Sequence, residues 1–248
     1  MPTPSYAGEV VIVTGGSSGI GAATAARFAK AGAEVYSFDK ATPSSAHWTH
    51  VDVDVRDVSG MKAAVDDIAA RHGRIDVLVA NAGIWTGVSL VDVSEALYDE
   101  ILAINVKGAF FAIQSVIPHM RRRKDGAVIV VGSDQSLVGK PEQNLYGLTK
   151  GAVAQLAKSC AAEFAPEGIR VNCVAPGTID TPFVEGAVND FAKKKNIDPD
   201  GLWDWLKTAQ PYPRLGHPDE VAALIATIPK IPFIVGATIS IDGGYTCQ

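Results

Sequence analysis

Short runs of valine and isoleucine recur along the chain, separated by longer stretches with the residue spacing of helices. The runs are too apolar to alternate between buried and exposed positions, which is typical of parallel strands covered on both faces. This pattern restricts the chain to α/β architectures. We expect about seven strands, at Val10–Val13, Glu34–Phe38, Trp48–Val53, Ile75–Val79, Ala127–Val131, Arg170–Val174 and Thr238–Ile241.

Helix-like stretches occupy most of the sequence between these runs. Strands that alternate with helices predict right-handed βαβ units and a doubly wound parallel sheet with helices on both faces. No linker, repeat or low-complexity segment interrupts the alternation, so we predict one domain over residues 1–248. The clearest expected helices are Ile20–Ala31, Val58–Arg71, Ala96–Arg121 and Leu145–Phe164.

One stretch, residues 178–214, departs from this alternation. It has no strand pattern, and prolines interrupt a sequence that is rich in aromatic residues, including Phe183 and Trp203. Irregular segments of this length inside a compact domain are usually functional loops. We predict a substrate lid here; the alternative is a pair of surface helices that plug an interface.

Composition excludes several classes of protein. With 22 basic and 27 acidic residues the formal net charge is −5, which argues against a partner made of nucleic acid or anionic lipid. The basic run at 121–124 fits a helix C-terminus. The three cysteines have no CxxC spacing and the histidines no ligand spacing, so we expect neither disulfides nor a metal. No signal peptide or uninterrupted apolar run of about 18 residues is present, which predicts a cytoplasmic protein without a membrane partner.

A glycine-rich turn, residues 14–21, lies between the first strand and the first helix. Glycines allow positive φ and let a diphosphate approach the backbone, and the helix N-terminus offers free N–H groups to that anion. The spacing Gly-x3-Gly-x-Gly differs from the usual dinucleotide fingerprint and from the loop that binds nucleoside triphosphates. A dinucleotide is therefore favoured over a triphosphate.

Asp39 ends the second strand, 18 residues after Gly21. A carboxylate at this point can accept hydrogen bonds from ribose hydroxyls and would repel a 2′-phosphate, which favours NAD and makes NADP the less favoured cofactor. The neighbouring Lys40 could offset part of that repulsion. Asp54 and Val55, after the third strand, are candidates for contact with the adenine.

Tyr146 and Lys150 are spaced i,i+4 and so share one face of an expected helix. A nearby cation stabilises a phenolate, lowers the tyrosine pKa and makes it a usable base. Ser133 follows the fifth strand at the sheet edge where such folds bind ligands. Asn105 lies inside a long expected helix, where a buried amide can hold a helix irregularity or a water.

Taken together, these residues resemble the short-chain dehydrogenase/reductase family over nearly the whole chain. Each motif alone is weak, but their common order is specific. The resemblance implies a Rossmann-like fold that binds NAD(P), usually as a homotetramer. Small residues at Gly151–Ala154 and Ala157 are compatible with helix packing between subunits, but core packing inside one chain would leave the same pattern. The matching pieces are residues 14–21, Asn81-Ala-Gly83, Asn105, Ser133, Tyr146-x3-Lys150, Pro176-Gly177 with Thr181, and Ile241-Asp-Gly-Gly244.

By this resemblance Tyr146 is the general acid/base, Ser133 orients the reacting oxygen, Lys150 binds the nicotinamide ribose and lowers the Tyr146 pKa, and Asn105 supports a water relay. Thr181 and the backbone near Ile179 would meet the carboxamide. The cofactor-binding residues that we expect are Gly15, Ser17, Ser18, Gly19, Ile20, Gly21, Asp39, Asp54, Val55, Asn81, Ala82, Gly83, Tyr146, Lys150, Pro176, Gly177, Ile179 and Thr181.

Substrate contacts are expected from Trp85, Asp134, Gln135 and Gln143. Their hydrogen-bonding groups suit a sugar, sugar acid or polyol, whereas Trp85 and the aromatic lid would equally suit a cyclic or apolar alcohol; ordinary loop solvation is the other interpretation. We therefore expect an NAD-dependent oxidoreductase acting on a secondary alcohol or ketone. The alternatives are an NADPH-dependent carbonyl or 3-oxoacyl reductase and a non-enzymatic nucleotide sensor.

Overall fold

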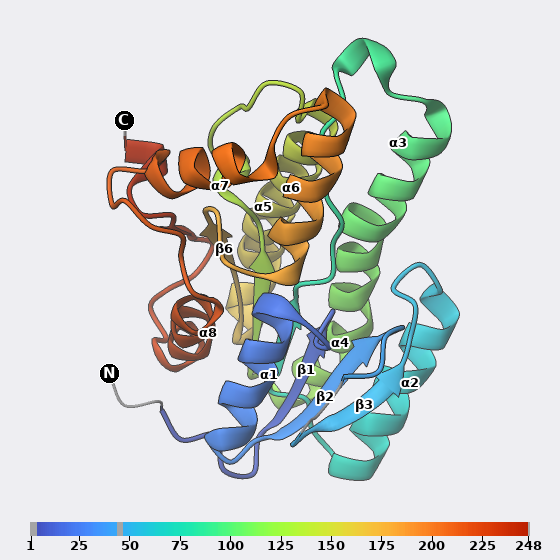
Figure 1. The fold of residues 1–248 in the computed structure, drawn as a ribbon. Helices are drawn as coiled ribbons and strands as arrows, with labels where there is room; N and C mark the ends of the chain where they lie inside the picture. The colour runs from blue at the N-terminus through green and yellow to red at the C-terminus, as the bar shows by residue number, and fades with distance from the viewer. Residues whose placement is uncertain (1–3, 44–46, 248) are drawn as a thin grey trace.

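The computed structural model describes residues 4–43 and 47–247, and its centre is one sheet of seven parallel strands (Figure 1). The strand order is β3-β2-β1-β4-β5-β6-β7. The order reverses between β1 and β4, which is the point where open α/β sheets bind ligands. The strands are β1 (Val10–Thr14), β2 (Glu34–Asp39), β3 (Thr49–Asp52), β4 (Val77–Ala80), β5 (Gly126–Val131), β6 (Ile169–Pro176) and β7 (Thr238–Ile241).

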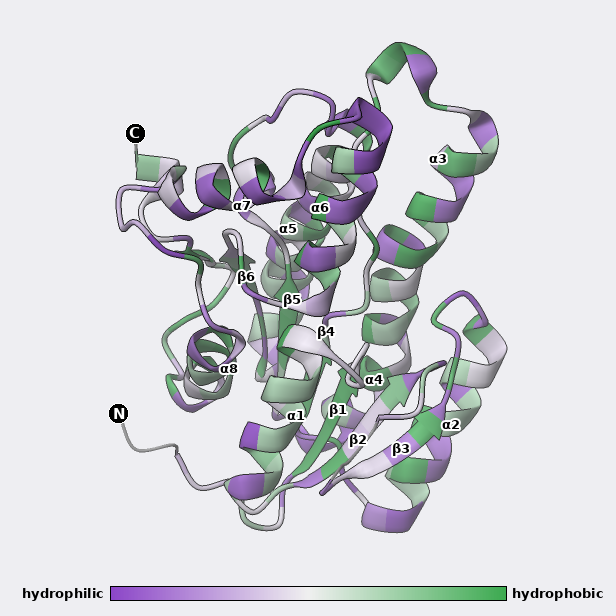
Figure 2. Cartoon of the chain, in the orientation of Figure 1, coloured by the Kyte–Doolittle hydropathy of each residue, from purple (hydrophilic) through white to green (hydrophobic). Residues whose placement is uncertain are grey.

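Helices cover both faces of the sheet. Helices α1 (Gly19–Lys30) and α8 (Pro218–Thr227) pack on one face, and α2 (Val58–His72), α4 (Ala109–Arg123) and α5 (Asn144–Phe164) on the other. Each face buries its own hydrophobic cluster. In Figure 2 the hydrophobic colour follows β1, β4 and β5, whereas hydrophilic residues mark the outer helices. The doubly wound fold expected from the valine-rich runs is confirmed.

The long helix expected at Ala96–Arg121 is divided into three parts. Helix α3 (Glu95–Leu102) passes through a π-helical segment, Ala103–Gly108, into α4. By length and composition this whole segment, Glu95–Arg123, is a possible membrane span, and 44% of its most apolar stretch is buried. A core helix packed on a sheet meets the same criterion, so the finding alone does not indicate a membrane protein.

The stretch 178–214 contains two helices, α6 (Pro182–Lys195) and α7 (Pro199–Thr208). The irregular structure expected there is wrong, because the stretch is largely helical, and its role as a lid stays a prediction. The prolines explain the error. Pro182 and Pro199 occupy the first positions of α6 and α7, where the missing N–H of proline has no cost. Proline also begins α8, a helix that the sequence pattern did not predict.

Single 3₁₀ turns complete the described structure, and one of them follows β5 at the functional edge of the sheet. It spans Asp134–Ser136 and begins directly after Ser133. The remaining 3₁₀ turns are Leu90–Asp92, Ala165–Glu167, Ile228–Lys230 and Tyr245–Cys247.

Candidate active site

The glycine-rich turn after β1 has no room for side chains. A Cβ on Gly21 would lie 2.0 Å from the carbonyl oxygen of Gly15, and Gly15 itself has a φ of +68°. Ser18 is the N-cap of α1, yet among the described residues its side chain forms no capping hydrogen bond. The first N–H groups of α1 therefore stay available to an anion, and the glycines let that anion approach the backbone. These residues fit a dinucleotide diphosphate.

Asp39 connects the end of β2 to the glycine-rich turn. One carboxylate oxygen accepts a hydrogen bond from the Ser17 amide at 3.0 Å, and the other accepts one from the Ala41 amide at 3.1 Å. A carboxylate oxygen has more than one lone pair, so both can still accept from ribose hydroxyls. Asp39 thus shapes the turn and remains able to bind a ligand.

The cations near Asp39 are directed towards another carboxylate. Arg56 donates through Nε to both oxygens of Asp54, at 3.0 Å each, and Lys40 Nζ lies 3.6 Å from the same group. The Arg56 hydrogen bonds hold the pKa of Asp54 at about 2. Asp54 therefore neutralises part of the positive charge that would otherwise favour a 2′-phosphate.

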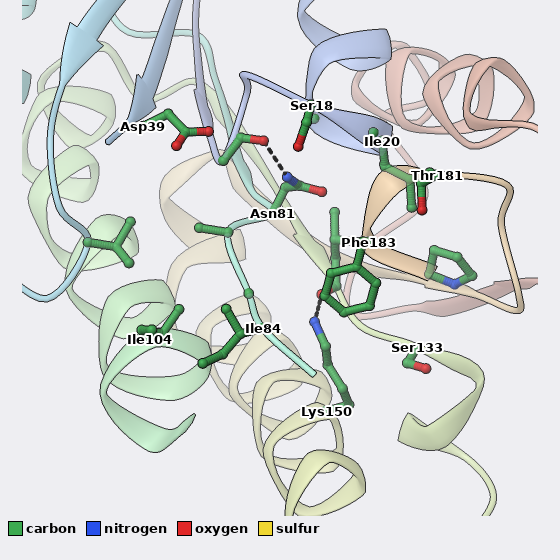
Figure 3. Close-up of a pocket in the computed structure, with 18 of the residues that line it drawn as sticks. Ser18, Ile20, Asp39, Asn81, Ile84, Ile104, Ser133, Lys150, Thr181 and Phe183 are labelled. Carbon is green, nitrogen blue, oxygen red and sulfur yellow. Dashed lines mark hydrogen bonds between the residues drawn. The ribbon is translucent and has the colours of Figure 1, made fainter. Parts of the chain in front are cut away.

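Asn81 braces the junction between β4 and the glycine-rich turn. Its side-chain amide donates to the carbonyl oxygens of Thr14 at 3.0 Å and Gly15 at 3.1 Å, while its backbone N–H donates to Thr14 Oγ1. Figure 3 shows Asn81 between Ser18 and Asp39 on one side and Lys150 on the other. The amide therefore fixes the turn at the place where β1 and β4 separate.

A cavity of about 520 Å³ runs along this edge of the sheet. Of the expected cofactor residues, Ser17 is absent from its lining, and the others all contribute. The cavity residues are Gly15, Ser18, Gly19, Ile20, Gly21, Phe38, Asp39, Lys40, Val53, Asp54, Val55, Arg56, Asn81, Ala82, Gly83, Ile84, Glu100, Ile104, Val131, Gly132, Ser133, Tyr146, Lys150, Pro176, Gly177, Ile179, Thr181, Phe183 and Val184.

Tyr146, Lys150 and Ser133 lie close together in the lining of this cavity and are all buried. Lys150 Nζ lies 5.6 Å from the centre of the Tyr146 ring and donates to the carbonyl oxygen of Val131 at 2.9 Å. This carbonyl ends β5, so the bond holds the ammonium at the sheet edge. The i,i+4 spacing on α5 thus delivers the two side chains to the same place.

Burial moves both pKa values towards the neutral forms. Desolvation raises the pKa of Tyr146, the Asp134 charge raises it further, and the hydrogen bond with Ser133 lowers it. Desolvation lowers the pKa of Lys150 to about 8. Burial and the Asp134 charge set the direction of the Tyr146 shift, and the lowering of this pKa by Lys150 stays a prediction.

Asn105 lies in the π-helical segment and is only 3% exposed. Its buried side-chain amide forms three hydrogen bonds. Oδ1 accepts from the Ile84 amide at 2.8 Å, and Nδ2 donates to the Ile84 carbonyl at 2.9 Å and to Thr149 Oγ1 at 3.1 Å. The predicted helix irregularity is present. Asn105 does not line the cavity but ties Ile84, which does, to α5.

The four expected substrate residues lie near Ser133, outside the set that lines the cavity. Gln143 Oε1 accepts hydrogen bonds from Trp85 Nε1, at 3.1 Å, and from Gln135 Nε2. Asp134 is 2% exposed and pairs with Lys140 and Ser133. Their contact with substrate stays a prediction.

Phe183 was expected to face the substrate as part of the aromatic stretch 178–214, and it lines the cavity. It lies on α6, and its ring centre is 6.5 Å from that of Tyr146. Other lining residues were not predicted as cofactor or substrate contacts. Ile84, which follows the Asn81-Ala-Gly83 motif directly, is one of them. Glu100 and Ile104 have no signal in the sequence, because only the fold brings α3 and the π-helical segment to the cavity. Within 4–43 and 47–247, no three His, Cys, Asp or Glu side chains are grouped so as to hold a metal ion.

Comparison with known proteins gives matches over nearly the full length. A family model described as enoyl-(acyl carrier protein) reductase matches residues 15–246. The cis-4-hydroxycyclohexanecarboxylate dehydrogenase of Sinomonas cyclohexanicum is 36% identical over 98% of both chains. The ligand-free aldohexose dehydrogenase of Thermoplasma acidophilum is 33% identical with a TM-score of 0.91, covering 97% of this chain and 94% of that one. ElxO with NADP bound is 30% identical with a TM-score of 0.87, covering 97% and 99%.

Proposed function

Because the chain belongs to the short-chain dehydrogenase/reductase family and is an oxidoreductase acting on CH–OH groups, we propose that it oxidises a secondary alcohol with NAD. The observation behind the proposal is the grouping of Tyr146, Lys150 and Ser133 in the lining of a cavity that also contains the glycine-rich turn. A bound nicotinamide supplies the hydride acceptor, which no side chain can provide.

The chain's own residues bind, orient and move the proton. The N-terminus of α1 and the glycine-rich turn hold a diphosphate. Asp39 accepts hydrogen bonds from ribose hydroxyls, and Lys150 donates to those of the second ribose. Tyr146 Oη accepts the alcohol proton, and Ser133 orients the reacting oxygen. Because burial raises the Tyr146 pKa, we expect oxidation to be fastest on the alkaline side of neutrality.

The preference for NAD is the part of the proposal that depends on Asp39. Its carboxylate lines the cavity, while Arg56 and Lys40 face Asp54. A 2′-phosphate would meet a negative charge with its nearest cations already paired. Equilibrium binding of NADH and NADPH tests this preference, and Asp39→Ala should reduce the ratio of the two affinities. Tighter binding of NADPH to the unaltered protein would refute it.

For the substrate we propose a hydroxyl-rich or cyclic secondary alcohol, such as a sugar, sugar acid, polyol or cyclohexanol derivative. Two relatives support this range, since one is named an aldohexose dehydrogenase and the other a hydroxycyclohexanecarboxylate dehydrogenase. Gln135 and Gln143 supply amide groups near Ser133, and Trp85 supplies an apolar ring. The lid function of residues 178–214 belongs to this proposal, supported by Phe183 beside Tyr146.

A second candidate is an NADPH-dependent carbonyl or 3-oxoacyl reductase. It is favoured by the description of the matching family model and by the NADP bound to ElxO. A screen that follows NAD reduction over sugars, sugar acids, polyols and cyclic alcohols separates the two. Failure with every alcohol, together with NADPH-dependent reduction of ketones or 3-oxoacyl esters, would replace the first candidate by the second.

Tyr146→Phe tests the assignment of the proton acceptor. The variant should lose turnover and keep NADH binding within a few-fold, because the phenol oxygen is needed for proton transfer and not for holding the cofactor. Activity above about one tenth of the wild-type value would contradict the assignment.

We further propose a cytoplasmic homotetramer that binds neither nucleic acid nor membranes. Exposed apolar side chains on α3, α4 and α5, namely Tyr98, Phe110 and Leu148, support assembly through these helices. The three cysteines are unpaired, as expected in a reducing compartment. Light scattering coupled to size exclusion gives the mass of the assembly, and a monomer would refute it.

A further inference from the structure

A buried ion pair lies directly behind the Ser133 hydroxyl. Ser133 Oγ and Asp134 Oδ1 are 2.8 Å apart, and Asp134 Oδ2 lies 2.6 Å from Lys140 Nζ. The Asp134 side chain is 3% exposed and that of Lys140 16%. Neither residue lines the cavity, whereas Ser133 does, so the pair reaches the cavity through the Ser133 hydroxyl.

The direction of the hydrogen bond at Ser133 follows from this pairing. Ser133 Oγ donates and Asp134 Oδ1 accepts, because a carboxylate that pairs with an ammonium has no hydrogen to give. Ser133 Oγ also accepts a hydrogen bond from the Gln135 amide at 3.2 Å. Asp134 therefore competes with Tyr146 for the single hydroxyl hydrogen of Ser133.

Lys140 is fixed from the far side by the end of the chain. Its ammonium lies 4.2 Å from the centre of the Tyr245 ring, in the last 3₁₀ turn. A cation over an aromatic face is stabilised by the ring quadrupole. The C-terminal turn thus holds the Lys140 charge close to Asp134.

The charges near Tyr146 come from few elements. Asp134 and Lys140 belong to the loop after β5, Lys150 belongs to α5, and Cys173 of β6 lies beside Lys150. Helix α6 contributes the uncharged ring of Phe183, and the C-terminal turn contributes Tyr245, whose ring faces Lys140. Asp134 is the carboxylate that disfavours the phenolate, and it raises the Tyr146 pKa.

We propose that Asp134 and Lys140 are positioning residues that fix the Ser133 hydroxyl and set the pH range in which Tyr146 accepts a proton. This inference rests on the proposed role of Tyr146. The negative charge of Asp134 opposes the phenolate, and the positive charge of Lys140 limits that opposition. The pair therefore shifts the pH dependence of alcohol oxidation through Ser133 and Tyr146.

If this proposal is correct, removing the charge of Asp134 and removing that of Lys140 shift the pH dependence of kcat/KM in opposite directions. Asp134→Asn leaves Lys140 uncompensated and replaces the carboxylate by a neutral amide, whose oxygen is a weaker acceptor for the Ser133 hydroxyl hydrogen. The acid limb of kcat/KM for alcohol oxidation should move down by about one pH unit. Lys140→Gln leaves Asp134 uncompensated, and the limb should move up by a similar amount. The double variant should return close to wild type.

The matched control is Lys62→Gln, which removes a lysine paired with Asp66 on the surface of α2. It should leave the pH profile unchanged. Shifts of both single variants in the same direction, or no shift in either, would overturn the inference. If Asp134→Asn does not fold, Lys140→Gln decides alone, since its side chain is partly exposed, and an unmoved limb then refutes the proposal.

The failure of this inference differs from that of the proposed function. If the wild-type enzyme oxidises alcohols but the pH profiles of Asp134→Asn and Lys140→Gln match its own, only the role of the ion pair is refuted. If the Tyr146→Phe variant keeps the activity of the wild-type enzyme, the role of Tyr146 is refuted and the inference with it. Asp134→Glu provides a rescue measurement, because it keeps the negative charge that Asp134→Asn removes and should bring the limb back towards the wild-type position.

Discussion

Asn105→Ala is the substitution whose effect follows most directly from the geometry. The variant loses three hydrogen bonds, two to the backbone of Ile84 and one to Thr149. At about 1 kcal/mol for each bond, we expect the free energy of unfolding to fall by about 3 kcal/mol. For a chain of this length that corresponds to a melting temperature lower by roughly 6–12 °C. Turnover should fall as well, because Ile84 and Gly83 line the cavity.

Thermal unfolding followed by circular dichroism measures the change in stability, with all variants at one protein concentration so that assembly is equal. Gln155→Ala is the control: this amide lies on α5, is exposed and forms one long hydrogen bond of 3.5 Å. It should change stability by less than about 0.5 kcal/mol. A melting temperature for Asn105→Ala within about 1 °C of wild type would show that these bonds do not hold the cavity wall, and would refute the reasoning.

Gly21→Ala should weaken NADH binding about tenfold or more, since overpacking costs about 1–3 kcal/mol and the new Cβ would lie 2.0 Å from the Gly15 carbonyl oxygen. Fluorescence titration measures the affinity, and Gly201→Ala, with nothing within 4 Å of its Cβ, should bind as wild type does. Lys150→Met should change how stability depends on pH. The folded-state pKa of Lys150 is lowered from 10.5 to about 8, so between these values the unfolded chain binds more protons and the free energy of unfolding rises with pH. The variant lacks that rise, and an identical stability difference from wild type at pH 7 and pH 10 would contradict the value.

The strands and the functional edge could be predicted because they depend on local patterns. Runs such as Val10–Val13 are buried on both faces, and their uninterrupted apolar composition predicts this burial. The glycine-rich turn, Asp39 and Ser133 each follow a strand, and parallel strands bring their carboxyl ends to one edge. Fold and cavity wall were thus largely readable from the sequence.

The remaining features depend on contacts between distant segments. Proline was interpreted as a helix breaker at 182 and 199, but an N-cap from Thr181 or Asp198 converts it into a helix start. The π-helical segment was foreseen only as an irregularity at Asn105, since its exact form depends on Ile84, 21 residues away. No local sequence pattern predicts that Lys140 pairs with Asp134 and faces Tyr245.

The same burial that positions the catalytic residues also opposes the charges that they need. Tyr146 and Lys150 are both buried, and desolvation favours the neutral form of each. A site that only had to be stable would replace Lys150 with an apolar side chain, yet here its ammonium is held by the Val131 carbonyl beside the tyrosine ring. The presence of the Lys150 ammonium, which is unfavourable to bury, is explained if it takes part in proton transfer at Tyr146. On this argument, Lys150→Met should give a protein that is more stable at neutral pH and inactive, and a less stable variant would show that the Val131 bond outweighs desolvation.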